Sequence, residues 1–136
     1  MSAATVILDD EAVQALRDVS HHKHRLVAGH LVAVTTRRSR GRAGRVVVPA
    51  TVRVEAGWDR RHPSAAAINR FRIDDAALDS GAANAAAGLR LIHGFSVTDA
   101  HVAHVACRTD VAVVVLTSDP GEIRAAVGPR VTVVAV

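Results

Sequence analysis

Four acidic side chains, widely separated in the chain, stand at positions where a fold could bring them together. Asp9 comes directly after a short apolar run of the kind that predicts a buried strand, and Asp119 follows another such run with Thr117 and Ser118 between. A helix is expected to begin at Thr98 or Asp99, and Glu55 lies about one turn into the helix that follows another apolar run. In open parallel sheets, ligands bind at the carboxyl ends of the strands. We therefore expect the four carboxylates to meet at that edge.

Carboxylates gathered in one place repel one another. Two like charges about 4 Å apart repel by roughly 4 kcal/mol at an effective dielectric constant of ~20. Such a cluster either holds protons at a raised pKa or requires a cation. Cys107 is the one cysteine, so a thiolate zinc cluster is excluded, and hard oxygen ligands favour Mg²⁺ or Mn²⁺. Acidic clusters that hold these ions serve phosphodiester hydrolysis, because the cation orients water and stabilises the charge of the transition state.

Helix capping is the alternative explanation for each aspartate taken singly. Asp119 precedes Pro120, which suits the first position of a helix, so Asp119 is the expected N-cap and Glu122 its capping-box partner. Glu55 lies inside a predicted helix and caps nothing. Capping therefore does not account for the whole set.

The elements that must position these acids alternate along the chain. Short apolar or brief strands are expected at Thr5–Leu8, Val46–Val48, Arg72–Asp74, Val111–Leu116 and Val131–Val136, with helices between them. This alternation predicts a parallel sheet covered by helices on both faces. The sequence contains no internal repeat and no long linker, so residues 1–136 are expected to form a single domain.

Composition narrows the class of protein. The chain has 136 residues, a net charge of +4 and only three aromatic residues, which argues against folds that stack bases on aromatic platforms. The opening segment MSAATVILDDE lacks the basic start of a signal peptide, and no apolar stretch approaches the ~20 residues of a membrane span. We therefore expect a cytoplasmic protein with no membrane association.

Four segments resemble the PIN-domain family, and within it the VapC-like toxin ribonucleases of type II toxin–antitoxin systems. They are ILDDEAVQAL (7–16), VVVPATVRVEAGW (46–58), GLRLIHGFSVTDAHVAHVA (88–106) and VVVLTSDPGEIRAA (113–126), in the order and at the spacing of the family. The resemblance implies a three-layer, Rossmann-like α/β fold and RNA cleavage that depends on Mg²⁺ or Mn²⁺. It also implies a cognate antitoxin and, commonly, a homodimer.

The resemblance also assigns roles to individual residues. Asp9, Asp99 and Asp119 would bind the metal directly or through water, and Glu55 would bind metal or orient the attacking water. The supporting residues would be Thr117 and Ser118 as hydrogen-bonding groups and Glu122 as a peripheral acid or capping partner. Two positions depart from the family pattern: Glu11 replaces a small polar residue, and Ser96 replaces an acid.

Basic residues suggest further contacts. An exposed loop is expected from Arg37 to Arg45, and its arginines could contact RNA phosphates or the acidic tail of an antitoxin: Arg37, Arg38, Arg40, Arg42 and Arg45. A solvated loop is the alternative. His101 and His104 are expected on the outer, solvated face of their helix. A second histidine group could bind a transition metal or simply form a basic surface: His21, His22, His24 and His30.

Two other functions fit parts of the sequence. A catalytically silent PIN-like domain would act as a binding or regulatory module. The motif ILDDE also resembles the acidic pocket of a receiver-like signalling domain, but such a domain needs a lysine after its last strand, and Lys23 is the one lysine. The sequence therefore favours the metal-dependent ribonuclease.

Overall fold

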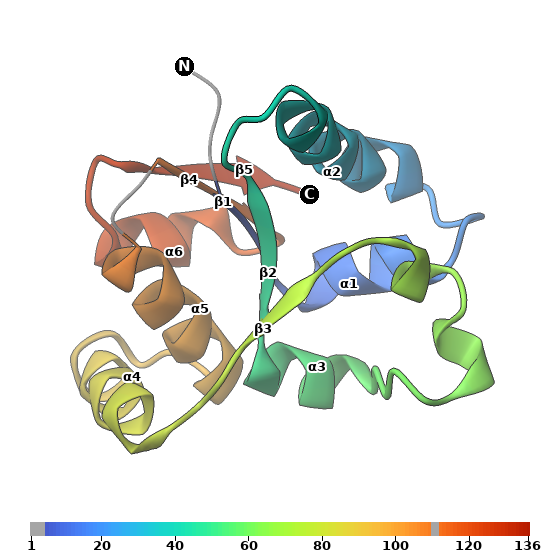
Figure 1. Ribbon diagram of the computed structural model, residues 1–136. Helices are drawn as coiled ribbons and strands as arrows, with labels where there is room; N and C mark the ends of the chain where they lie inside the picture. Colours follow the sequence, from blue (N-terminus) through green and yellow to red (C-terminus); the bar gives the residue numbers. More distant parts are fainter. Residues whose placement is uncertain (1–4, 110–111) are drawn as a thin grey trace.

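The sheet organises the molecule. The computed structural model describes residues 5–109 and 112–136, and five parallel strands form one sheet in the order β3-β2-β1-β4-β5 (Figure 1). The strands are β1 Thr5–Leu8, β2 Arg45–Pro49, β3 Asp74–Ala76, β4 Val113–Thr117 and β5 Val131–Ala135. All neighbouring strands pair in parallel, so their carboxyl ends lie at one edge.

The central strand β1 sets the register of the site. It pairs with β4 so that Leu8 lies opposite Leu116, and the backbone N–H of Asp9 donates to the carbonyl of Leu116 over 3.1 Å. The residues that follow β1 and β4 are therefore neighbours in space although about 110 positions separate them in the sequence.

Helices cover both faces of the sheet and give a three-layer α/β fold. Figure 1 shows α1 and α2 on one side and α5 and α6 on the other, with α4 packed outside α5. The helices are α1 Asp10–Arg17, α2 His24–Ser39, α3 Ala50–Ala56, α4 Ser80–His93, α5 Val97–Arg108 and α6 Pro120–Ala126. Two short 3₁₀ helices, Pro63–Ala65 and Ile68–Arg70, lie between α3 and β3. This arrangement confirms the predicted fold class.

Apolar strand residues form the core, as the apolar runs predicted. All four residues of β1 are buried, and so are Val46 to Pro49 of β2. Burial on both faces removes the alternation of a half-exposed strand, which is why these runs are continuously apolar. The strand expected from Val111 is observed from Val113; Val111 itself lies outside the described residues.

Two predicted boundaries are wrong. Arg37 and Arg38 belong to the last turn of α2 and Arg45 begins β2, so the exposed connection is shorter than the predicted loop. The brief strand expected at Arg72–Asp74 lies at Asp74–Ala76. Neither boundary coincides with an apolar run, which explains why the sequence placed both poorly.

A helix that crosses a membrane must be long and apolar. Within residues 5–109 and 112–136, no helix combines the length and the apolar character that crossing a bilayer requires.

Candidate functional site

The four predicted acids line one cavity at the carboxyl edge of the sheet. Its volume is about 280 Å³, and Asp9, Glu55, Asp99 and Asp119 all contribute to its wall. The other lining residues are Asp10, Val52, Ser96, Thr98, Val102 and Ser118. Four separate segments of the chain therefore bring carboxylates to the same space, as the sequence predicts.

Asp9 is the most deeply buried of these acids, with 5% of its surface exposed. It is the N-cap of α1, and its Oδ1 accepts the backbone N–H of Ala12 at 2.9 Å. Its Oδ2 accepts the N–H of Ser118 at 2.8 Å. Burial raises the pKa of Asp9, while these amide hydrogen bonds and one with Thr117 act in the opposite direction.

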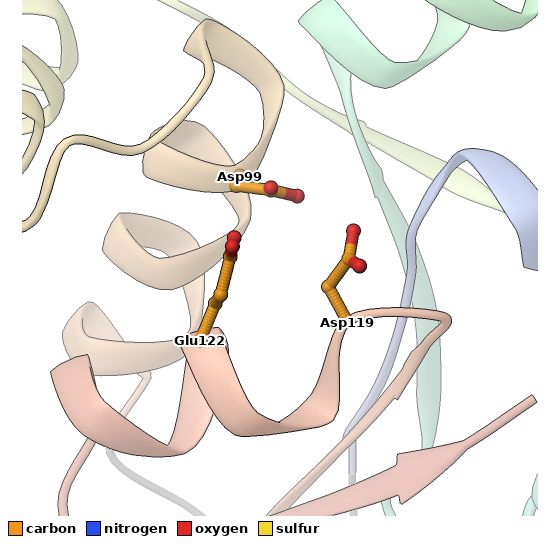
Figure 2. Close-up of side chains that lie close together, drawn as sticks. All are labelled: Asp99, Asp119 and Glu122. Atoms are coloured by element: carbon orange, nitrogen blue, oxygen red, sulfur yellow. The ribbon is translucent and has the colours of Figure 1, made fainter.

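Asp99, Asp119 and Glu122 form the closest group of acids. One carboxylate oxygen from each lies within 4.8 Å of the others, and Figure 2 shows the three side chains converging from α5 and α6. Among the residues that the structure describes, only this group brings three or more histidine, cysteine or acidic side chains close enough to share an ion. Carboxylate oxygens of this kind suit Mg²⁺ or Mn²⁺.

Within this group, the pKa of Asp99 is clearly shifted. Burial raises the pKa of Asp99 to about 6, and the nearby charges of Asp119, Glu122 and Asp9 add to the effect. The hydrogen bond with Ser96 acts in the opposite direction. The cavity thus concentrates negative charge beyond what its own hydrogen bonds compensate.

The local structure at Asp119 differs from the predicted cap. Asp119 does occupy the N-cap position before Pro120, but its side chain makes no capping hydrogen bond. Its backbone N–H instead donates to Thr117 Oγ1 at 2.9 Å. The predicted capping box with Glu122 is therefore wrong, and the carboxylates of both residues face Asp99 instead (Figure 2).

The start of α5 also differs from the prediction. The helix begins at Val97, and Ser96 is its N-cap, accepting the backbone N–H of Asp99 at 3.1 Å. Asp99 is thus the third residue of the helix rather than its first. The serine that stands where the family has an acid serves to hold the first turn that carries Asp99.

Glu55 and Asp10 also line the cavity, and they come from α3 and α1. Glu55 is an exposed residue of α3, and Asp10 is the first residue of α1. Burial raises the pKa of Asp10, and the charge of Glu55 raises it further. The sequence prediction missed Asp10, because an acid in the first turn of a helix is explained by the helix dipole alone.

Glu11, the other departure from the family pattern, lies outside the site. Its carboxylate forms ion pairs with Lys23 at 3.2 Å and His21 at 3.5 Å. It therefore joins α1 to the segment before α2, and it does not line the cavity.

The predicted position of His101 is wrong. Its side chain is fully buried, and its Nδ1 lies 2.9 Å from Thr51 Oγ1. The helical spacing predicts the outer face of α5, but His101 faces Thr51 of α3, and α3 packs against α5. His104 is half-buried.

The second histidine group forms no metal site among the described residues. His24 Nδ1 lies 2.8 Å from the carbonyl oxygen of Ala15, and His21 Nδ1 accepts the backbone N–H of Lys23 at 3.0 Å. The rings of His21 and His22 stack at 4.7 Å. These contacts give the histidines local structural roles.

The arginine segment lies far from the acidic cavity. Arg45 begins β2, whereas the acids follow the ends of the strands, so the two features occupy opposite edges of the sheet. Arg37 Nε and Arg38 Nε donate to the carbonyls of Ala43 and Gly44 at 2.9 and 2.7 Å. The remaining arginines of the segment, Arg40, Arg42 and Arg45, are exposed.

Comparison with known proteins supports the fold. No family model matches the chain, and no curated protein matches its sequence. Among solved structures, the chain is similar to one in the crystal structure of VapBC2 from Rickettsia felis bound to a DNA fragment from their promoter. The TM-score is 0.59, the identity is 9%, and the match covers 96% of this chain and 98% of that chain. At so low an identity, this likeness concerns the fold alone: the chain shares its α/β architecture with that chain.

Proposed function

We propose that this chain is a divalent-metal-dependent ribonuclease of the VapC-like type. One observation carries the proposal: acids from four separate segments, Asp9, Glu55, Asp99 and Asp119, line the same cavity. Each acid taken alone could be a cap or a surface charge, but their meeting at the carboxyl edge of a parallel sheet points to ligand binding. The shared fold with a chain of a VapBC2 complex supports the same reading.

The residues present fit a divalent cation. Asp99, Asp119 and Glu122 would hold it, because their carboxylate oxygens lie within 4.8 Å of one another. An all-oxygen, anionic donor set selects Mg²⁺ or Mn²⁺ over softer metals. Burial and the charges of neighbouring acids raise the pKa of Asp99, and a cation beside the group would favour its ionised form.

Different residues of the cavity would have different roles in hydrolysis. A divalent cation, when bound, would supply positive charge that stabilises the transition state of phosphodiester hydrolysis. Glu55, an exposed residue that also lines the cavity, would orient the attacking water and accept its proton. Thr117 and Ser118 would act as supporting groups, since they directly precede Asp119 and make hydrogen bonds at the end of β4.

We also propose an antitoxin as the protein partner. The likeness to a chain of a VapBC2 complex supports this assignment. The exposed side chains of Arg40 and Arg42 would meet an acidic segment of such a partner, at the edge of the sheet away from the cavity. The homodimer stays a prediction of the family resemblance.

The test is cleavage of a mixed RNA pool by the purified chain with Mg²⁺, with Mn²⁺ and with chelator. The native chain should cleave RNA only with metal. Asp119→Asn should lower the rate by roughly two orders of magnitude or more, because it removes charge where the cation would be held. Asp59→Asn is the matched control, since Asp59 is exposed and pairs with Arg61 outside the cavity.

The outcome separates the two functions that the sequence allows. A chain that binds RNA or protein but cleaves nothing under any metal condition would be a silent binding module. Cleavage that is equal in the native chain and in Asp119→Asn would contradict the assigned site.

A further inference from the structure

The hydrogen bonds of Asp9 set it apart from the other acids of the cavity. Its two carboxylate oxygens accept backbone N–H groups from Ala12 and Ser118, at 2.9 and 2.8 Å. A side-chain hydrogen bond with Thr117 adds a third partner. A carboxylate offers about four acceptor positions, so most of its capacity is used within the protein.

Thr117 extends this set of contacts to Asp119. Its side chain is fully buried, and its Oγ1 accepts the backbone N–H of Asp119 at 2.9 Å. A hydroxyl that accepts one hydrogen bond can still donate its own proton, here toward Asp9. Asp9, Thr117 and Ser118 thus form one set of contacts, which we call the Asp9 bridge, between the end of β1 and the turn from β4 to α6. Asp9 and Thr117 are buried in it, and Ser118 is exposed.

The side chain of Asp119 does not help to hold the turn that the Asp9 bridge supports. The side chain of Asp119 makes no capping hydrogen bond, so its direction depends on the backbone of the turn. Glu122 follows in the same helix, and both must stay near Asp99 for the three oxygens to remain within 4.8 Å. A small rotation of the Ser118–Asp119 backbone would separate them.

We propose that Asp9 is a positioning residue of the cation site, and that it acts through Thr117 and Ser118 to hold Asp119 toward Asp99 and Glu122. This positioning role is distinct from the metal ligation that the family resemblance implies for Asp9, and it does not depend on that ligation. The inference rests on the proposed function in one respect: it assumes that the site binds a divalent cation. The bridge itself exists without any cation, so it can be tested separately.

The first measurement is amide hydrogen exchange in the metal-free protein, followed by NMR. In Asp9→Asn one oxygen becomes an amide NH₂ group, which cannot accept the N–H of Ser118 while the remaining oxygen caps α1. Exchange at Ser118 should become roughly tenfold faster. A carboxylate that served only as a metal ligand would leave this exchange unchanged without metal, and that result would overturn the proposal.

The second measurement is Mn²⁺ affinity by calorimetry, which uses a pair of variants that alter no charge. Thr117→Val removes the hydroxyl and should weaken Mn²⁺ binding by roughly 10-fold, as loss of a group that orients a ligand does. Thr117→Ser keeps the hydroxyl and should bind like the native chain. Equal affinity in Thr117→Val and the native chain would overturn the proposal, and this pair decides the matter even if Asp9→Asn does not fold.

Glu122→Gln completes the comparison. It removes a proposed ligand, so it should weaken Mn²⁺ binding more than Thr117→Val or Asp9→Asn does. Asp9→Asn should retain weakened binding, and binding by Asp9→Asn equal to that of the native chain would overturn the proposal. A native chain that takes up no Mn²⁺ would contradict the proposed function, while exchange at Ser118 would still decide whether Asp9 holds the turn.

Discussion

The carboxyl group of Asp99 lies where burial and three neighbouring acids act on it together. Burial contributes most to its raised pKa of about 6, and the charges of Asp119, Glu122 and Asp9 follow. The same group would gain most from a cation, because a nearby positive charge favours the ionised carboxylate. Metal binding and protonation of Asp99 therefore compete.

The raised pKa of Asp99 gives a pH dependence of stability in the metal-free protein. The pKa of Asp99 is raised from 3.8 to about 6, so the folded chain holds a proton that the unfolded chain releases between these values. The contribution of Asp99 to stability is present below about pH 4 and is lost as the pH rises through about 6. Asp99→Asn should therefore be more stable than the native chain at pH 7, by roughly 1–2 kcal/mol after allowance for solvent screening.

Urea unfolding at pH 4 and pH 7, with chelator, checks this prediction. The difference between the variant and the native chain should be small at pH 4 and should grow toward pH 7. A native chain more stable than Asp99→Asn at pH 7 without metal would show that the carboxylate is already compensated within the fold.

The residues themselves were only partly predictable. The sequence identified Asp9, Glu55, Asp99 and Asp119, because each stands in a recognisable position relative to a strand or helix. It did not identify the place of Glu122 beside Asp99, since a capping box explained the same spacing equally well. Such choices depend on side-chain directions, and spacing alone does not determine these directions.

Among the helices, α4 contains a glycine in its interior and is followed by another at its C-terminal cap. The helix ends at Gly94, whose φ of 70° lies in the left-handed region. Gly88 lies inside the same helix, and a Cβ there would meet nothing within 4 Å. Two glycines of one helix therefore have opposite consequences.

Gly94→Ala should destabilise the chain by roughly 1–2 kcal/mol, because a Cβ is unfavourable at this φ. Gly88→Ala should stabilise it by roughly 0.5–1 kcal/mol, because alanine favours the helix interior. Thermal unfolding of both variants at one pH measures the difference. Equal effects of the two substitutions would contradict the assigned end of α4.

Elements with a strong apolar pattern were predictable, and those held by tertiary contacts were not. The runs in β1, β2 and β4 predicted strands near the observed positions. Strand β3 has three residues, Asp74–Ala76, and no buried residue, so its position comes from pairing with β2. The burial of His101 likewise depends on the packing of α3 against α5, which helical spacing within α5 does not reveal.

At the scale of the whole molecule, the sheet separates the acidic cavity from the arginine segment. The cavity lies beyond the ends of β1 and β4, and Arg45 begins β2. A strand of five residues spans about 16 Å, so the exposed arginines before β2 lie roughly that far or farther from the acids. Figure 1 shows this separation, with the turn between α2 and β2 at the end of the sheet opposite α3.

The double substitution Arg40→Gln and Arg42→Gln should therefore leave cleavage of a short oligonucleotide within about twofold of the native rate, because screening over such a distance is nearly complete at physiological salt. Binding of an acidic partner protein should weaken in the same variant. Cleavage rates and pull-down of the partner measure the two effects. A large loss of cleavage would place RNA across the arginine segment.

Calorimetric titration with Mn²⁺ at pH 7.5 measures whether the acidic cavity binds a divalent cation. The native chain and the Asp59→Asn control should bind Mn²⁺ with the same affinity, and Asp119→Asn should bind it far more weakly. No detectable binding by the native chain, or equal binding by the native chain and Asp119→Asn, would contradict the account.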